Sequence, residues 1–330
     1  MRSKINAVAA LVGGLAGTLA LSAGSAYAQQ WPQRQIFLIV PFAAGGGTDT
    51  FARPLAAKLD KQLDTRILIE NRAGAGGTSG AAAAAKAAPD GHTFFVGATH
   101  HAIAPAIYPK LTYDIEQDFI PIAMISRPPH VVVVNPTKVT AKTLAELIAA
   151  ANANPDKMNY ASAGVGTTHH LAGELFKMLT KTKIAHVPYR GAGPAMQDLI
   201  AGHVDIAFDG MGSSAPAISG GQINALAVAA AQRVPAFPNL PTAAEAGLKG
   251  YEVSTWYALW APKGTPTAIV TRMMAEVKTA LSDPAIKEMW ERNGSDVPAM
   301  EGAEFGRFVS SEVARWRDVV KASGVKLEGG

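Results

Sequence analysis

Apolar runs alternate with amphipathic or Ala-rich segments along most of the chain. Short runs of branched or aromatic residues between turn residues predict buried strands, whereas apolar residues three or four apart predict helices. We expect strands at 36–40, 66–71, 92–98, 131–134, 158–163, 184–189 and 204–209. We expect helices near 50–63, 143–154, 266–282 and 302–322, and Gly turns that lead into helices at 74–88, 164–180 and 191–203. Thr143 and Glu146 have the spacing of a capping box. Apolar strands that alternate with helices predict an α/β fold with mainly parallel sheets.

The alternation is interrupted twice, near 126–136 and 254–262, by extended segments bounded by proline. A complete α/β block lies between the two interruptions, and a chain of this length exceeds the usual size of a single core. We therefore expect two lobes with the second inserted into the first. Lobe 1 would comprise 29–127 and 256–330, and lobe 2 would comprise 128–255. Two hinge segments would connect them, and a ligand would bind in the cleft between them.

The N-terminal residues have the pattern of a secretory signal peptide. Arg2 and Lys4 precede an uncharged, mostly apolar run over 7–21, and Ala26-Tyr27-Ala28 is an A-x-A cleavage signal. We expect residues 1–28 to be removed. An exported, Ala- and Gly-rich chain without cysteine cannot rely on disulfides, so its stability must come from a hydrophobic core. These features together predict a soluble periplasmic protein.

The charge balance excludes a nucleic-acid partner. The chain carries 30 Lys and Arg against 26 Asp and Glu, for a formal net charge of +4, and it has no cluster of basic residues. Nucleic-acid binding requires such a basic patch.

Four predicted strand-to-helix turns are rich in glycine, at 45–47, 74–77, 164–166 and 191–193. None fits the dinucleotide fingerprint G-x-G-x-x-G, and the phosphate-binding sequence G-x-x-x-x-G-K-[ST] is absent. We therefore expect no cofactor. The backbone N–H groups at helix N-termini instead form anion sites that need no Lys or Arg. Hydroxyl groups flank these turns at Thr48, Thr78, Ser79, Thr99, Thr167 and Thr168. Two lobes with such turns predict the binding of a small carboxylate.

Catalytic and metal chemistry have weaker support. The sequence Tyr160–Gly164 lacks the first glycine of the nucleophile motif G-x-S-x-G. An exported α/β hydrolase that uses Ser162 and His169 remains an alternative. The adjacent pairs His100-His101 and His169-His170 would point in different directions from a helix, and no H-E-x-x-H motif is present, so we expect no metal site.

Several long blocks resemble a known family. They are PFAAGGGTDTFAR (41–53), IENRAGAGGTSG (69–80), ASAGVGTTHHLAGELF (161–176), VPYRGAGPAMQDLIAGHVD (187–205), PTAAEAG (241–247) and WAPKGTP (260–266). They resemble the Bug receptors, the TctC-like periplasmic solute-binding proteins of tripartite tricarboxylate transporters. The resemblance implies a type II periplasmic-binding-protein fold that closes on a carboxylate and delivers it to membrane permease subunits. We expect a monomer that is not an enzyme. A ligand sensor for a membrane signalling partner is a further alternative.

The resemblance and the turn chemistry together select the ligand-binding residues. They are Phe42, Gly46, Gly47, Thr48, Asp49, Thr99, His100, Ser162, Gly166, Thr167, His169, Arg190, Gly191 and Asp209. Asp49 is either the N-cap of its helix or an acceptor for the ligand. Arg190 either grips the ligand or forms a salt bridge near the hinge. His170 is expected to face away, and Trp256 and Tyr257 to pack in the hinge. The expected ligand is an aromatic or other dicarboxylate, followed by citrate-like acids.

Overall fold

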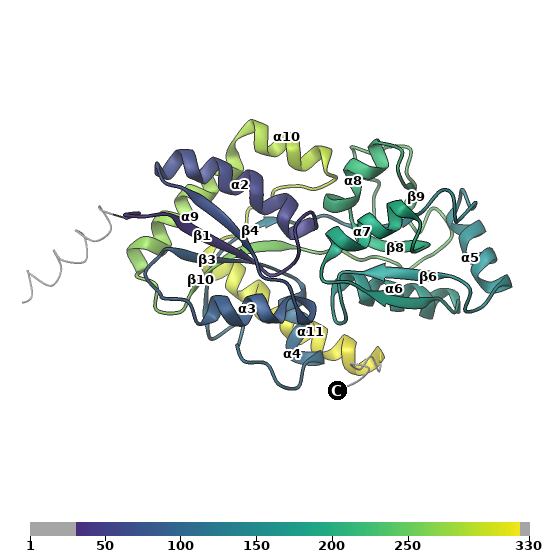
Figure 1. Cartoon of the computed structure of the whole chain (residues 1–330), viewed down its shortest axis with the longest axis horizontal. Helices are drawn as coiled ribbons and strands as arrows, with labels where there is room; N and C mark the ends of the chain where they lie inside the picture. Colours follow the sequence, from purple (N-terminus) through teal and green to yellow (C-terminus); the bar gives the residue numbers. More distant parts are fainter. Residues whose placement is uncertain (1–30, 324–330) are drawn as a thin grey trace, which may run out of the picture.

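The computed structural model describes residues 31–323, and these residues form two lobes. The predicted signal peptide, 1–28, lies outside the described residues. In Figure 1 one lobe, mostly purple, blue and yellow, contains both ends of the described chain, and the teal and green lobe contains its middle. We call them lobe 1 and lobe 2. Within the described part of the chain, no helix combines the length and the apolar character needed to cross a membrane.

Lobe 1 is built on a five-stranded sheet with the order β2-β1-β3-β10-β4. Its strands are β1 (Ile36–Val40), β2 (Ile67–Asn71), β3 (Thr93–Ala98), β4 (Phe119–Ser126) and β10 (Tyr257–Pro262). One hydrophobic cluster packs the sheet against α2 (Gly47–Leu63), α9 (Thr267–Ser282) and α10 (Pro284–Arg292). A second cluster covers the other face with α3 (Thr78–Ala85), α4 (His100–Ile107) and α11 (Gly302–Ser323). A short 3₁₀ turn, η1 (Ala75–Gly77), precedes α3.

Lobe 2 repeats this plan with the order β7-β6-β8-β5-β9. Its strands are β5 (His130–Val134), β6 (Asn159–Ser162), β7 (Ala185–Pro188), β8 (Ile206–Gly210) and β9 (Asn224–Val228). One face of the sheet packs on α5 (Leu144–Ala153) and α6 (Thr168–Thr180), and the other on α7 (Ala192–Ala201) and α8 (Met211–Ser219).

The two sheets share one topology, in which four strands run in one direction and one is reversed. In lobe 1 the reversed strand is β10, which pairs antiparallel with β3 and β4. In lobe 2 it is β5, which pairs antiparallel with β8 and β9. Each reversed strand is the first one formed after the chain enters that lobe from the other. The predicted two-lobed α/β fold with mainly parallel sheets is therefore confirmed.

The local elements agree with the sequence patterns where periodicity was strong. All seven expected strands form, and Thr143 caps α5 by accepting a hydrogen bond from the backbone N–H of Glu146. The sequence analysis did not predict β4, β9, β10, α4, α8 or α10. Proline explains part of this, because Pro105 lies within α4 and Pro216 within α8. The strands of the lobe-1 sheet lie within 36–126 and 257–262. The exact boundaries of the lobes, predicted at 127/128 and 255/256, stay a prediction.

Candidate functional site

The N-terminal ends of four helices meet at the seam between the lobes. These helices begin at Gly47 (α2), His100 (α4), Thr168 (α6) and Ala192 (α7). Hydrogen bonds cross the seam there, and two of them involve backbone carbonyl groups of lobe 2. The backbone N–H of Ala43 donates to the carbonyl oxygen of Arg190 over 3.1 Å, and the hydroxyl of Tyr108 donates to the carbonyl oxygen of Val165 over 2.8 Å. The lobes are therefore closed on one another along the glycine turns.

Glycine at these turns permits the close approach. Gly46 is the N-cap of α2 and lies against the backbone N–H groups of Ala192 and Gly193. A Cβ atom at Gly193 would overlap the carbonyl oxygen of Ala44 in the other lobe. A Cβ atom at Gly47 would overlap the hydroxyl of Tyr257. The glycines thus let two helix N-termini, one from each lobe, pack against each other across the seam.

Asp49 is not the N-cap of α2, because the helix begins earlier, after Gly46. Its buried carboxylate accepts hydrogen bonds from the backbone N–H of Gly45 (3.0 Å), from Nδ2 of Asn71 (3.1 Å) and from Nε of Arg53 (2.6 Å). A carboxylate in the first turn that reaches back to a preceding N–H resembles one half of a capping box. Asp49 therefore fixes the glycine turn, and its contact with a ligand stays a prediction.

His100 connects the two lobes. Its Nδ1 atom accepts a hydrogen bond from the backbone N–H of Thr168 over 3.1 Å. Its ring stands edge-on to Phe42, with centroids 5.1 Å apart, and lies 5.6 Å from the ring of His169. Burial, reinforced by His169 and other nearby histidines, holds the pKa of His100 well below its usual value. The imidazole is therefore neutral, as an acceptor at Nδ1 must be.

His169 and Asp209 are brought together from α6 and β8. Nε2 of His169 lies 2.9 Å from Oδ1 of Asp209, and both side chains are almost fully buried. The hydroxyls of Ser213 and Ser214 donate to the other carboxylate oxygen, Oδ2, over 2.8 and 2.7 Å. Burial alone would raise the pKa of Asp209, but His169 and the two hydroxyls outweigh it and keep the pKa below the usual value. Asp209 is therefore ionised inside the protein.

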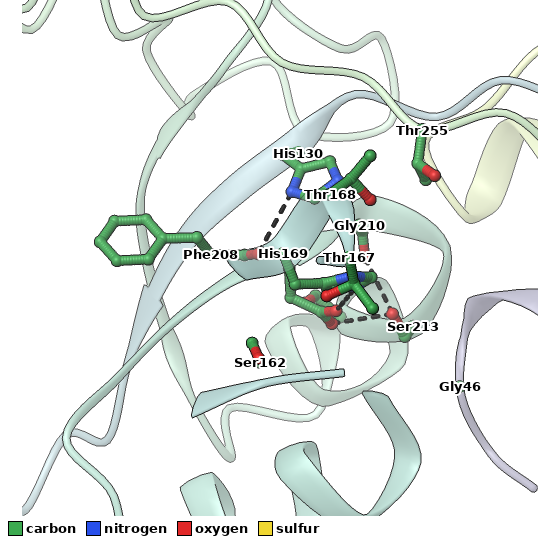
Figure 2. Close-up of polar contacts among 12 residues, drawn as sticks. Gly46, His130, Ser162, Thr167, Thr168, His169, Phe208, Gly210, Ser213 and Thr255 are labelled. Carbon is green, nitrogen blue, oxygen red and sulfur yellow. Dashed lines mark hydrogen bonds and ion pairs between the residues drawn. The ribbon is translucent and has the colours of Figure 1, made fainter. Parts of the chain in front are cut away.

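His130 completes this cluster, although the sequence analysis missed it. Its ring lies 5.0 Å from that of His169 and is fully buried. Its Nδ1 atom lies 3.2 Å from the carbonyl oxygen of Phe208 and must donate to it. Burial, together with His169, lowers the pKa of His130 to about 3. Figure 2 shows His130, His169 and Ser213 converging near the end of β8.

Several polar atoms of this cluster have no hydrogen-bond partner within 31–323. They are Nε2 of His130, Nδ1 and Nε2 of His169, and Oδ1 of Asp209. Nε2 of His169 and Oδ1 of Asp209 still face each other at 2.9 Å as an ion pair, so Nε2 of His130 and Nδ1 of His169 are the atoms of the cluster that lack a polar partner among the described residues. Buried polar atoms are nearly always bonded, and an orphan costs about 1–3 kcal/mol. Their gathering at one place is typical of a binding site.

The proposed catalytic pair of Ser162 and His169 is not formed. Oγ of Ser162 instead lies 2.6 Å from Nε2 of His186, and it accepts from the backbone N–H of Gly164 over 3.1 Å. His186 stacks on His170, with ring centroids 4.2 Å apart. His170 thus faces a different cluster from its neighbour His169, as expected. The hydrolase hypothesis in its predicted form is wrong, because the two side chains have different partners.

The remaining predicted residues shape the lobe-2 turns. Thr167 is the N-cap of α6 and accepts from the backbone N–H of His170. Gly166 and Gly191 both have positive φ angles, and Gly191 is the N-cap of α7. Arg190 is exposed and forms no ion pair within 31–323, and its carbonyl group accepts a hydrogen bond from lobe 1.

The hinge side of the site is packed rather than open. Oγ1 of Thr99 accepts from the backbone N–H of Trp256 over 2.8 Å. The indole of Trp256 donates to the carboxylate of Glu312 and packs in the lobe-1 core, as predicted for a hinge residue. Thr48 is buried in the first turn of α2. Within the described residues, no group of three or more His, Cys, Asp or Glu side chains is placed to hold a metal ion.

Comparison with known proteins gives a consistent result. Residues 51–325 match the profile of the tripartite tricarboxylate transporter family receptor, TctC. The structure of the periplasmic binding protein BugD superposes with a TM-score of 0.86 at 34% identity, covering 90% of this chain and 99% of BugD.

Two similar structures contain ligands. Rpa4515 of R. palustris, solved with adipate, gives a TM-score of 0.86 at 37% identity, covering 90% of this chain and 99% of that one. MatC (Rpa3494) from Rhodopseudomonas palustris, solved with bound malate, gives 0.83 at 38% identity, covering 88% of this chain and 100% of that one. One of the similar proteins is thus a periplasmic binding protein, and two others hold small dicarboxylates.

Proposed function

Because this chain belongs to the family of tripartite tricarboxylate transporter receptors, we propose that it is a periplasmic receptor for a small organic carboxylate. It captures the carboxylate between its two lobes and delivers it to the permease subunits of a tripartite tricarboxylate transporter. The export signal predicted at 1–28 agrees with this location. The protein acts as a monomer and performs no chemistry on its ligand.

One observation carries the proposal: helix N-termini from both lobes converge on a seam that also holds unpartnered buried polar atoms. Free N–H groups and the helix dipole favour an anion there. About four charge-assisted hydrogen bonds at about 1.5–3 kcal/mol each supply roughly 6–12 kcal/mol before the costs of association. Association costs at least about 4 kcal/mol, so the upper end of this range leaves about the 8 kcal/mol net that micromolar affinity requires. The arrangement therefore accounts for useful binding without a Lys or Arg side chain.

The ligand proposed from the sequence is an aromatic or other dicarboxylate, with citrate-like acids next. Phe42 lines the seam beside His100, which agrees with an apolar part of the ligand. The adipate and malate bound by similar proteins are both dicarboxylates. These observations support a ligand with two carboxylates, one for each lobe.

A thermal-shift screen of purified protein tests the proposal. The panel should contain mono-, di- and tricarboxylates and aromatic acids. A ligand at about 100-fold above its Kd adds about 2.7 kcal/mol to the free energy of unfolding. If no carboxylate stabilises the correctly folded protein, the proposal is wrong. Deleting the gene and measuring uptake of the identified acid separates a transport receptor from a sensor, because only a transport receptor is needed for uptake.

A further inference from the structure

We propose that a groove between α6 and α11 is the surface on which the permease subunits recognise the closed receptor. Its occupant is an apolar segment of a permease subunit with a basic residue at its flank. In Figure 1 the C-terminal end of α11 reaches the seam near α6, and the two helices line the same groove although they belong to different lobes. This inference rests on the proposed function, because it names the contact with the partner that the function requires.

The groove is mainly apolar and has a volume of about 660 Å³. Its apolar lining comes from Leu171, Leu175 and Met178 of α6, Val253 of the crossover segment, and Trp316 and Val319 of α11. The three residues of α6 are spaced by four and then three positions, so they form one stripe along the helix. The stripe faces α11 across the groove, and the two helices form its walls.

Exposed apolar side chains gather at this groove. Among the residues that the structure describes, the large hydrophobic side chains that are exposed are those of Met178 (63%), Val319 (40%) and Leu179 (37%). Met178 and Val319 line the groove from opposite lobes, and Leu179 is the chain neighbour of Met178. Apolar side chains that are exposed together at one place mark an interaction surface.

The groove is continuous with the contact between the lobes. Leu171 belongs to lobe 2, yet it is buried in the hydrophobic cluster that covers one face of the lobe-1 sheet and includes Trp316. Because the two walls belong to different lobes, any opening of the cleft moves α6 relative to α11. The groove therefore keeps this shape only while the lobes are closed. A partner that fits it distinguishes the loaded receptor from the empty one.

The charged residues of the groove determine which kind of segment fits. Nζ of Lys177 donates to both carboxylate oxygens of Glu174, over 2.8 and 3.0 Å. Arg315 donates to the carboxylate of Glu312 over 2.8 Å. Glu252 is exposed and forms no ion pair with another residue of the described chain. The groove thus has a free carboxylate for a basic group and no free cation for an acidic one, so a basic apolar segment is complementary to it.

The patch is too small to hold a second copy of the chain. A stable dimer buries about 800 Å² per partner, of which about 65% is apolar. Even an aromatic side chain offers only about 150–250 Å², and Met178, Leu179 and Val319 are each only partly accessible. The area suits one inserted segment and a transient contact, as a receptor that must release from its transporter requires.

Uptake measurements in a strain that lacks the gene test this inference. The radiolabelled substrate is the carboxylate of the thermal-shift panel that stabilises the protein most. Met178→Lys and Val319→Lys each place a charge in the groove, one from each lobe, at exposed positions near helix C-termini where Lys suits the helix dipole. In calorimetry we expect both variants to bind the acid within about twofold of the unmodified protein, but to support uptake about 10-fold or more slowly at limiting receptor. The matched control is Leu179→Lys, which makes the same change on α6 outside the groove and should support normal uptake.

Photo-crosslinking in the same cells identifies the occupant. A benzophenone amino acid in place of Met178 should form an adduct with a permease subunit when the acid is present, and much less of it when the acid is absent. An adduct with a second copy of the chain would make the groove a dimer interface and overturn the inference. Equal yields with and without the acid would contradict recognition of the closed form.

The uptake assay separates failure of this inference from failure of the proposed function. If either groove variant supports uptake at the unmodified rate, or if Leu179→Lys reduces uptake as much, the groove is not the docking surface while the carboxylate receptor stands. Slow uptake that is explained by weaker binding of the acid would also contradict a role in docking. If the unmodified protein binds no carboxylate or fails to restore uptake, the proposed function fails and this inference fails with it.

Discussion

Replacing Gly193 with alanine should prevent the lobes from closing without damaging either lobe. Gly193 is the second residue of α7, where alanine is favoured over glycine by about 1 kcal/mol. The three atoms nearest to an added Cβ belong to Ala44 and Gly45, which are in lobe 1. The added methyl group therefore meets the opposite lobe and not its own.

The size of the effect follows from the overlap. The added Cβ would penetrate the carbonyl oxygen of Ala44 by about 1 Å relative to normal contact, so the lobes must separate by about that much at this point. The hydrogen bond from Ala43 to Arg190, now 3.1 Å, would then be broken. Losing two or three hydrogen bonds at about 1 kcal/mol each costs about 2–3 kcal/mol. We therefore expect the affinity for the identified carboxylate to fall about 30- to 150-fold.

Calorimetry gives the affinity, and small-angle X-ray scattering gives the compaction on adding ligand. Gly193→Ala should bind weakly and stay more extended than the unmodified protein at saturating ligand. The control is Gly306→Ala, the same chemical change within α11, where the nearest atom is a side-chain carbon of Pro121 at 3.2 Å. It should bind and close normally. If Gly193→Ala binds with full affinity and compacts fully, the seam described here is not the ligand-bound closed state.

Two further predictions concern stability. The pKa of His130 is lowered to about 3 and that of His101 to about 4, in both cases chiefly by burial. Below pH 6.5 the unfolded chain binds protons at these residues and the folded chain does not. As the pH is lowered from 6.5 to about 4, the free energy of unfolding should therefore decrease by up to about 1.4 kcal/mol per pH unit for each histidine. Urea unfolding curves that coincide at pH 7 and pH 5 would contradict this. Glu312→Ala should cost about 2–4 kcal/mol, because the buried indole N–H groups of Trp256 and Trp316 lose their acceptor. Glu312→Gln keeps an acceptor oxygen and should cost less, as measured by thermal unfolding of both variants. Equal losses would show that the missing hydrogen-bond acceptor is not what destabilises Glu312→Ala.

The sequence predicted much of the fold because strand and helix periods are local properties. The apolar runs at 36–40 and 131–134 and the capping residue Thr143 formed the predicted elements. The elements that were missed carry mixed signals. Pro105 within α4 is one example, because proline disfavours a helix interior. The tertiary contacts of α4 with α11 and β3 stabilise the helix nonetheless.

The candidate site was only partly accessible from the sequence. The glycine turns and their position at helix N-termini followed from the pattern, as did the different surroundings of His169 and His170. The hydrogen-bond partners of these side chains could not be predicted from the sequence. Ser162 is paired with His186 rather than His169, and Asp49 secures a turn rather than capping its own helix.

The sequence alone thus determined the fold class, the glycine turns and the residue types available for a carboxylate. Successive helical residues point about 100° apart, so adjacent histidines must diverge, but only the packed structure decides which of them faces the cleft. His130, His169 and Asp209 come from β5, α6 and β8, and they meet because the crossover connections place these elements side by side. Contacts between residues so far apart in the chain depend on packing, and no local pattern specifies them.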